Sequence, residues 1–142
     1  MHIPQVRYTE ADKAFVNIYN AQAVALAAGD SVVWYTTSPD GVRTYQPTTA
    51  TLSLFVGVAD SPIPTLSYGE AQAYGYRSAA LVTNTTDQII TAGDILVPMD
   101  QKDYLGRSGQ SDGKYGFVFA GETVATAATP AAALKKVFIR AL

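Results

Sequence analysis

Short runs rich in β-branched, aliphatic and aromatic residues recur along the chain, and the run at 51–58 alternates apolar with small or polar residues, which is the period of two shown by half-buried β-strands. Runs with this strand composition lie at 14–19, 31–37, 42–45, 51–58, 77–82, 95–97, 115–120, 123–126 and 137–142. No window carries a long apolar period of 3.6 residues, so we expect little helix. About nine short strands at this spacing are typical of a small β-barrel or β-sandwich. The sequence therefore predicts a compact all-β fold.

Two stretches 64 residues apart share one turn pattern, Ala-Gly-Asp followed by an apolar run. The first contains Gly29 and Asp30, and the second contains Gly93 and Asp94. Glycine supplies a positive φ, and an aspartate side chain bonds to the backbone close by, so each stretch predicts a structural turn that launches a strand. The stretch Gly-Val-Ala-Asp at 57–60 lies between them. The spacing suggests two related halves, although a chain of 142 residues predicts one compact core.

The first thirteen residues are mixed and polar, and Pro4 disfavours a helix there. We predict an extended N-terminal arm at 1–13 followed by a single β-domain at 14–142. Ile3, Pro4, Val6 and Tyr8 are the candidate anchors of this arm. One interpretation is an extended segment that adds to the sheet edge of a neighbour, and the other is a frayed terminus without a role.

Three further segments carry local predictions. Ser-Pro-Asp-Gly at 38–41 predicts a hairpin turn between two strands. The polar, glycine-bearing stretch at 100–114 is the longest candidate loop. Thr129 followed by Pro130 is the pattern of a helix start, so we expect one helical turn through Lys136 before a short final strand.

Composition narrows the classes of function. The chain has ten Lys and Arg against twelve Asp and Glu, and only 15 % of its residues are charged. This balance lacks the basic footprint of a nucleic-acid binder, and low charge is consistent with a surface partly covered by a partner. No signal sequence or apolar run of membrane-spanning length is present, so we expect a soluble protein with no membrane partner. The absence of cysteine excludes disulfides and thiolate chemistry.

The sequence offers no catalytic constellation, and we expect a protein that is not an enzyme and has no cofactor. The single histidine, His2, lies in the arm, where it is a poor general base or metal ligand. The loop aspartates between 100 and 112 lack a calcium-binding spacing and suit a solvated loop better, so we predict no metal site. Glu70 and Glu122 are isolated, and the sequence neither assembles nor excludes them as a glycosidase pair.

Aromatic and basic residues leave two questions open. The nine tyrosines suit half-buried strand positions or oligomer interfaces, and alternatively they line a face on which a sugar or base stacks. Lys135, Lys136 and Arg140 form a small basic end near the final strand. They either protect a solvated strand edge from aggregation or contact an acidic partner surface.

Four blocks, read together, resemble the capsid decoration proteins of tailed bacteriophages. The first runs from Asn17 to Trp34 and reads N-x-x-N-A-Q-A-x-A-L-A-A-G-D-x-V-V-W. The others are G-V-A-D at 57–60, I-T-A-G-D-I-L-V at 90–97 and K-V-F-I at 136–139. The order of the blocks resembles that family over residues 14–142, although each block is short.

The resemblance implies a β-rich fold of the β-tulip or barrel type and homotrimers on the outside of a phage head. It further implies a protein made in the host cytoplasm that stabilises the virion by bridging major capsid protein subunits, with neighbouring decoration subunits as further partners. It brings no catalytic residues. The alternatives are a carbohydrate-binding or other accessory β-domain of a virion or secreted protein, and a lipoyl-type or biotinyl-type domain. Neither Lys102 nor Lys114 lies in the lysine motif of that last class.

Overall fold

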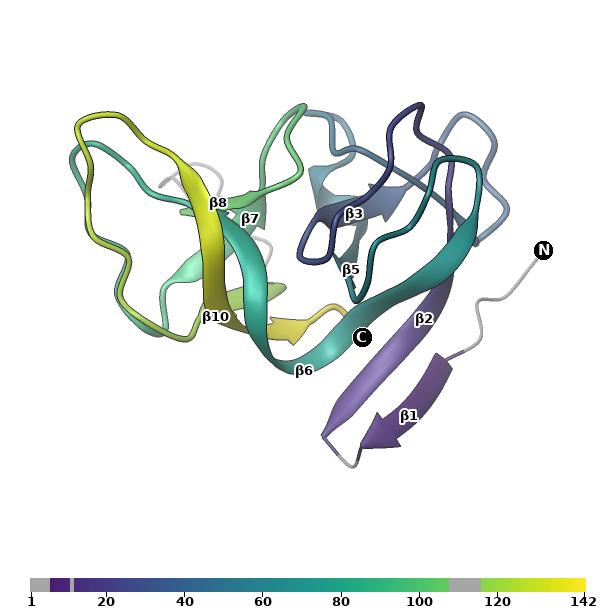
Figure 1. Ribbon diagram of the computed structural model, residues 1–142, viewed down its shortest axis with the longest axis horizontal. Helices are drawn as coiled ribbons and strands as arrows, with labels where there is room; N and C mark the ends of the chain where they lie inside the picture. The colour runs from purple at the N-terminus through teal and green to yellow at the C-terminus, as the bar shows by residue number, and fades with distance from the viewer. Residues whose placement is uncertain (1–5, 11, 108–115) are drawn as a thin grey trace.

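The computed structural model describes residues 6–10, 12–107 and 116–142, with side chains described from residue 12 onward (Figure 1). The described residues form one ten-stranded sheet and a single short 3₁₀ turn at Leu52–Leu54. The strands are β1 (Val6–Glu10), β2 (Lys13–Asn20), β3 (Ser31–Trp34), β4 (Arg43–Tyr45), β5 (Phe55–Ala59), β6 (Tyr68–Thr83), β7 (Ile95–Pro98), β8 (Leu105–Arg107), β9 (Val118–Ala120) and β10 (Ala132–Arg140). The prediction of an all-β fold is therefore confirmed.

The strand pairings close into two rings that share β6. In the N-terminal ring, β2 pairs with β4, β4 with β3, β3 with β5, β5 with β6, and β6 with β2. In the C-terminal ring, β6 pairs with β8, β8 with β7, β7 with β9, β9 with β10, and β10 with β6. Figure 1 shows β3 and β5 on one side of β6, and β7, β8 and β10 on the other.

Strand β6 passes from one ring into the other near Gly75. Its first part pairs with β2 up to Tyr74, and its second part pairs with β10 from Tyr74 to Thr83. Gly75 has φ +102°, and a Cβ at this position would lie 2.3 Å from the backbone oxygen of Asp12. A residue with a side chain would be strained there and would collide with the backbone. Glycine therefore permits the strand to continue between the rings.

The two Ala-Gly-Asp stretches form the same turn in each ring. The Asp30 carboxylate accepts a hydrogen bond from the Ala27 N–H at 2.8 Å, and the Asp94 carboxylate accepts one from the Thr91 N–H at 2.9 Å. The glycine before each aspartate has a positive φ, +99° in the first turn and +94° in the second. Both turns precede strands, β3 and β7, as the sequence predicts.

The correspondence between the halves extends beyond these turns. Leu26 forms an isolated antiparallel bridge with Ile63, and Ile90 forms one with Val124. The second bridge takes the place of the strand that the sequence predicts at 123–126. Because the pairings of β3, β4, β5 and β2 match those of β7, β8, β9 and the second part of β6, the prediction of two related halves is confirmed.

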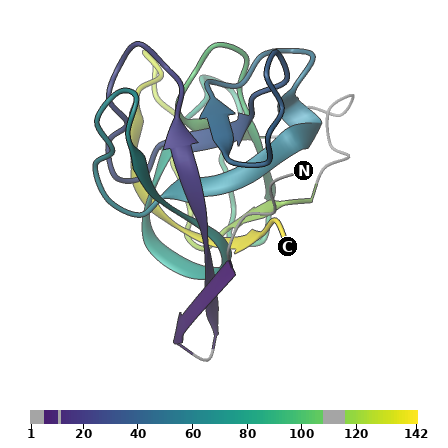
Figure 2. The ribbon, with the colours of Figure 1, turned by 90° about the vertical axis from the view of Figure 1, so that its right-hand side faces the viewer.

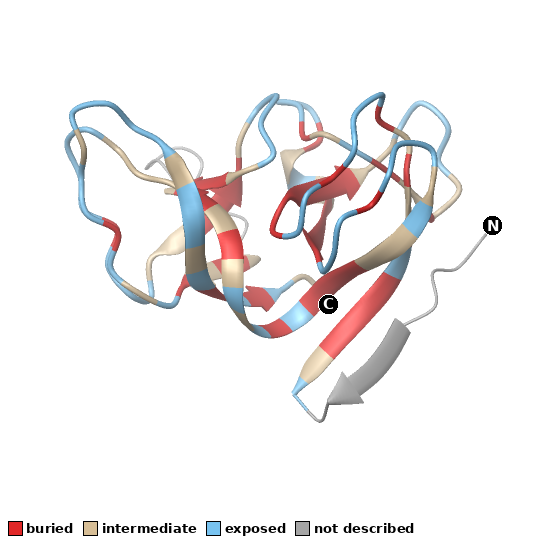
Figure 3. Ribbon diagram, in the orientation of Figure 1, coloured by how far each residue is buried: buried red, intermediate tan, exposed pale blue. Residues whose placement is uncertain are grey.

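Most of the buried hydrophobic residues form two clusters, one centred on each ring, so the prediction of one compact core is wrong; Phe55 and Val58 of β5 pack into the C-terminal cluster. The N-terminal cluster consists of Val16, Ile18, Leu26, Val32, Val56, Ala59, Ile63, Ala71 and Ala73. The C-terminal cluster consists of Phe55, Val58, Ala80, Val82, Ile90, Leu96, Leu105, Val118, Ala120, Val124, Val137 and Ile139. Figure 3 shows buried positions on the strands of both rings and exposed positions mainly on the loops. Closing the sheet into two rings gives two small cores, which chain length alone does not predict.

Two local predictions are also wrong. The segment expected to form a helical turn from Thr129 to Lys136 instead enters β10, where Ala132 to Lys135 pair with β6. Backbone pairing along this long strand overrides the local helix-start pattern. The loop expected at 100–114 contains β8, which pairs with both β7 and β6. The hairpin turn at 38–41 is confirmed, because β3 and β4 pair on either side of it.

The two repeat turns give a matched test of packing. A Cβ on Gly29 would lie 2.8 Å from the Leu134 side chain and 3.2 Å from the Ala79 backbone oxygen, whereas one on Gly93 would meet nothing within 4 Å. We expect Gly93→Ala to lower the free energy of unfolding by about 1–3 kcal/mol through backbone strain. Gly29→Ala should lower it by at least about 1 kcal/mol more through overpacking. Urea unfolding of both variants measures the difference, and equal losses would contradict the described packing of the first turn.

Candidate functional site

The predicted arm is only partly within the described residues. Ile3 and Pro4 lie outside them, and Val6 and Tyr8 lie in β1. Strand β1 pairs antiparallel with β2 of the same chain, with Val6 opposite Val16. It is the terminal strand of the sheet order, and Figure 2 shows the β1–β2 hairpin projecting away from the two rings. This part of the arm therefore extends the edge of its own sheet.

The first of the two predicted turns is packed against the rest of the protein. Gly29 and Asp30 are buried, and the Gly29 carbonyl accepts a hydrogen bond from the Leu81 N–H of β6 at 2.9 Å. Burial raises the pKa of the Asp30 carboxyl, the hydrogen bond from the Ala27 N–H lowers it, and the nearby charge of Asp103 raises it further, leaving it above its ordinary value. This first turn therefore fixes the N-terminal ring against the strand that both rings share.

The second turn is open to solvent. Gly93 is exposed, and the Asp94 carboxylate lies 3.6 Å from the Arg107 guanidinium. An exposed ion pair of this kind contributes little to stability. Neither turn gathers a group of side chains suited to catalysis. Within the ranges 12–107 and 116–142, no cluster of three or more His, Cys, Asp or Glu residues is placed to hold a metal.

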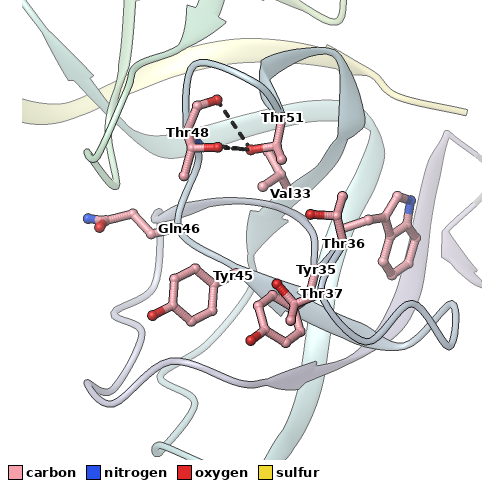
Figure 4. A pocket seen from close by; sticks show the side chains of 9 residues that line it. Val33, Tyr35, Thr36, Thr37, Tyr45, Gln46, Thr48 and Thr51 are labelled. Atoms are coloured by element: carbon pink, nitrogen blue, oxygen red, sulfur yellow. Dashed lines mark hydrogen bonds between the residues drawn. The ribbon is translucent and has the colours of Figure 1, made fainter.

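A pocket with a volume of about 260 Å³ opens on the outside of the N-terminal ring, between β3, β4 and the segment that follows β4 (Figure 4). Its floor includes Val33, which is buried. The aromatic rings that line it are those of Tyr35 and Tyr45, while Trp34 borders the pocket with its side chain packed against the N-terminal core cluster. Its polar lining consists of Thr36, Thr37, Gln46, Thr48 and Thr51. None of these lining residues carries a charge, so the pocket is both aromatic and neutral.

Local structure brings the pocket residues together. The β3–β4 register sets Tyr45 opposite Val33, and the Tyr35 N–H donates to the Arg43 carbonyl at 3.0 Å. The Asp40 carboxylate closes the connecting turn by accepting hydrogen bonds from the N–H groups of Arg43 at 2.8 Å and Val42 at 3.0 Å. These two bonds, that from Arg43 first, hold the pKa of the Asp40 carboxyl below its ordinary value. The hairpin is thereby held both by bonds between its strands and by bonds within its connecting turn.

The two tyrosines stack on one another, with ring centroids 5.1 Å apart and planes inclined by 25°. Figure 4 shows these rings side by side at one end of the pocket and Thr48 with Thr51 at the other. The two threonine hydroxyls lie 3.0 Å apart, and the Thr51 hydroxyl also accepts from the Thr48 N–H at 2.9 Å. The pocket therefore has a fixed polar end and an aromatic end.

A second candidate surface, the β6–β10 face, lies on the outside of the sheet where the two rings join. Its exposed apolar residues are Tyr74, Tyr76, Leu134 and Phe138. Tyr74 packs edge-on against Phe138, with ring centroids 5.5 Å apart. Phe138 lies opposite Tyr76 in the strand register, and Arg140 lies opposite Tyr74.

Basic residues accompany this face. Lys136 and Arg140 of the predicted basic end are exposed and share the outer side of β10 with Phe138. The face therefore combines apolar rings with positive charge. Among the described residues no helix is long and apolar enough to cross a membrane.

Comparison with known proteins adds no identification. No protein-family model matches the chain, and no curated protein matches it in sequence. The site must therefore be interpreted from its own geometry.

The sequence does not reveal either surface as a site. The tyrosines stand out as a group in the sequence, but nothing in it separates those that converge in the fold from those that do not. The sequence signal for the pocket is a concentration of aromatic residues on one predicted hairpin. Trp34 and Tyr35 lie on its first strand, and Tyr45 lies on its second strand. For the β6–β10 face the register of two strands separated by about 60 residues was needed, and no local pattern fixes it.

The buried carboxyl of Asp30 makes a pH-dependent contribution to stability. Because its pKa is higher in the folded state than in the unfolded chain, its contribution is fully present below pH 3.8 and is lost as the pH rises through the folded-state pKa. We expect wild type to become less stable relative to Asp30→Asn as the pH rises from acidic to neutral. Urea unfolding of both proteins at a series of pH values measures this, and a constant difference would contradict the assignment.

Proposed function

We propose that the protein is a capsid decoration protein of a tailed bacteriophage. It binds the outer surface of the head as a homotrimer, and it stabilises the head by bridging major capsid protein subunits and neighbouring decoration subunits. The sequence resemblance over residues 14–142 suggests this role, and the β-tulip-type architecture is part of the same proposal. The structural observation that carries the proposal is the exposed β6–β10 face.

The composition of this face suits protein contact. Aromatic and arginine side chains are the residues most enriched at protein interfaces, and Tyr76, Phe138 and Arg140 lie together here. A cluster of exposed apolar side chains on a monomer marks an interaction site. Lys136 and Arg140 favour a partner surface that carries carboxylates, because opposite charges steer association.

Simple thermodynamics explains how the proposed bridging stabilises a head. A protein that binds only the assembled lattice stabilises that lattice by mass action. A trimer with three contacts on one lattice gains effective concentration without any new type of contact. No catalytic group, cofactor, nucleic acid or membrane is required by this function.

The β6–β10 face should carry much of the binding to heads. Replacing Tyr76 and Phe138 with alanine together removes two exposed rings, and we expect the apparent affinity for purified expanded heads to fall by at least about tenfold, or ~1.4 kcal/mol. Sedimentation of heads with bound protein measures occupancy. Tyr35→Ala, which changes an aromatic residue on the other candidate surface, is the matched control and should bind normally. Undiminished occupancy of the double variant would contradict a role for the face.

The N-terminal arm should also contribute to binding. Deleting residues 1–11 removes β1 but leaves β2 complete, so the N-terminal ring stays closed. We expect this deletion to lower occupancy on heads, because the proposed contacts of β1 and of the arm's apolar residues are lost. Thermal unfolding of the truncated protein controls for folding, and unchanged occupancy would rule out the arm as an anchor.

A further inference from the structure

Comparison of the two rings shows that a ring of this kind closes without the aromatic pocket found in the N-terminal ring. Through the matched strand registers, Tyr45 corresponds to Gly106, since the two lie opposite Val33 and Val97 respectively. A Cβ on Gly106 would lie 2.7 Å from the Met99 sulfur, so Met99 occupies that space in the C-terminal ring. The ring therefore closes without a tyrosine pair, and the aromatic pocket is a feature added to one ring.

The aromatic end of the pocket presents a ring surface to solvent. Tyr45 is 37 % exposed although it stacks on Tyr35, so the pair is only partly covered by the protein. Aromatic rings held in place by stacking offer a large apolar contact area at little entropic cost, because few torsions are fixed on binding. The preformed stack therefore suits a flat, rigid ligand surface.

The polar lining defines the ligand's chemistry. Thr36, Thr37 and Gln46 make no side-chain hydrogen bond with any residue that the structure describes. Hydroxyl and amide groups both donate and accept hydrogen bonds, which matches a ligand whose own groups do the same. With no charged side chain in the lining, the pocket offers nothing to neutralise a phosphate, a carboxylate or a cation. A neutral ligand with several hydroxyl groups fits best.

We propose that this pocket binds a neutral sugar ring, which stacks on the Tyr35–Tyr45 pair and bonds to the threonine and glutamine side chains. Its volume of about 260 Å³ is slightly below the range of roughly 300–1,000 Å³ common for drug-sized ligands, which suits one ring with its neighbours in solvent. This inference does not depend on the capsid role, because the pocket and the β6–β10 face share no residue.

The single tryptophan of the chain, Trp34, borders the pocket although its ring packs against the N-terminal core cluster, so its emission is followed together with the heat of binding. The full chain is titrated with glucose, galactose, mannose and N-acetylglucosamine while both signals are followed. Concentrations reach about 50 mM, well above the ~1 mM dissociation constant expected for one small ring. We expect a saturable change in emission or heat with at least one of these sugars. No saturable change in either signal with any of them would overturn the proposal.

Variants separate the pocket from other surfaces. Tyr45→Ala should weaken sugar binding by at least about tenfold, and Gln46→Ala should weaken it less. Tyr76→Ala alters an exposed tyrosine outside the pocket and should bind sugar as wild type does. Thermal unfolding verifies that each variant is folded. Retained binding in folded Tyr45→Ala would overturn the assignment.

Two further measurements distinguish this inference from others. Adenosine and uridine are titrated in the same way, and saturation by a nucleoside but by no sugar would replace the proposed ligand class. Tyr45→Ala is also tested on purified heads, where we expect normal occupancy. Loss of sugar binding with normal occupancy supports the pocket alone, whereas loss of both would contradict the independence of the two surfaces.

Discussion

The structure depends on the sharing of one strand between two closed rings. Strand β6 closes the N-terminal ring by pairing with β2 and β5, and it is also a member of the C-terminal ring, where it pairs with β10 and β8. This continuity requires a residue at the crossing that tolerates positive φ and the close approach of Asp12, and Gly75 meets both conditions. One buried cluster is centred on each ring, and β6 contributes side chains to both.

How much the sequence predicts depends on the range of the interactions involved. The Ala-Gly-Asp turns and the hairpin at 38–41 follow from contacts within a few residues, and both are confirmed. The strand β10 is predicted in part as a helical turn, because its pairing with β6 joins residues about 50 to 66 positions apart and leaves no local trace. The glycines of β6 resemble strand breakers in sequence, yet they permit the strand to continue. The pocket needed the exact pairing of Tyr45 with Val33, which the alternation of residue types suggests but does not fix.

The two halves agree inside the rings and differ outside them. Leu26 and Ile90, or Val32 and Leu96, occupy matching buried positions that the closed sheet requires. At the outer positions, Tyr45 in one ring corresponds to Gly106 in the other. A repeated framework fixes the core and leaves the surface free to differ, and for this reason a candidate site is found by comparing the halves. The pocket is such a difference between the halves.

The uninterrupted course of β6 has a mechanical consequence. Two domains joined by a loop rotate relative to one another, and the loop absorbs strain between them. Here the connection is a strand hydrogen-bonded on both sides, so a load applied to one ring is carried to the other through sheet bonds rather than through a hinge. The connection between the two rings therefore resists hinge rotation. A force on a surface of one ring is passed to the other ring with little change in the distance between them.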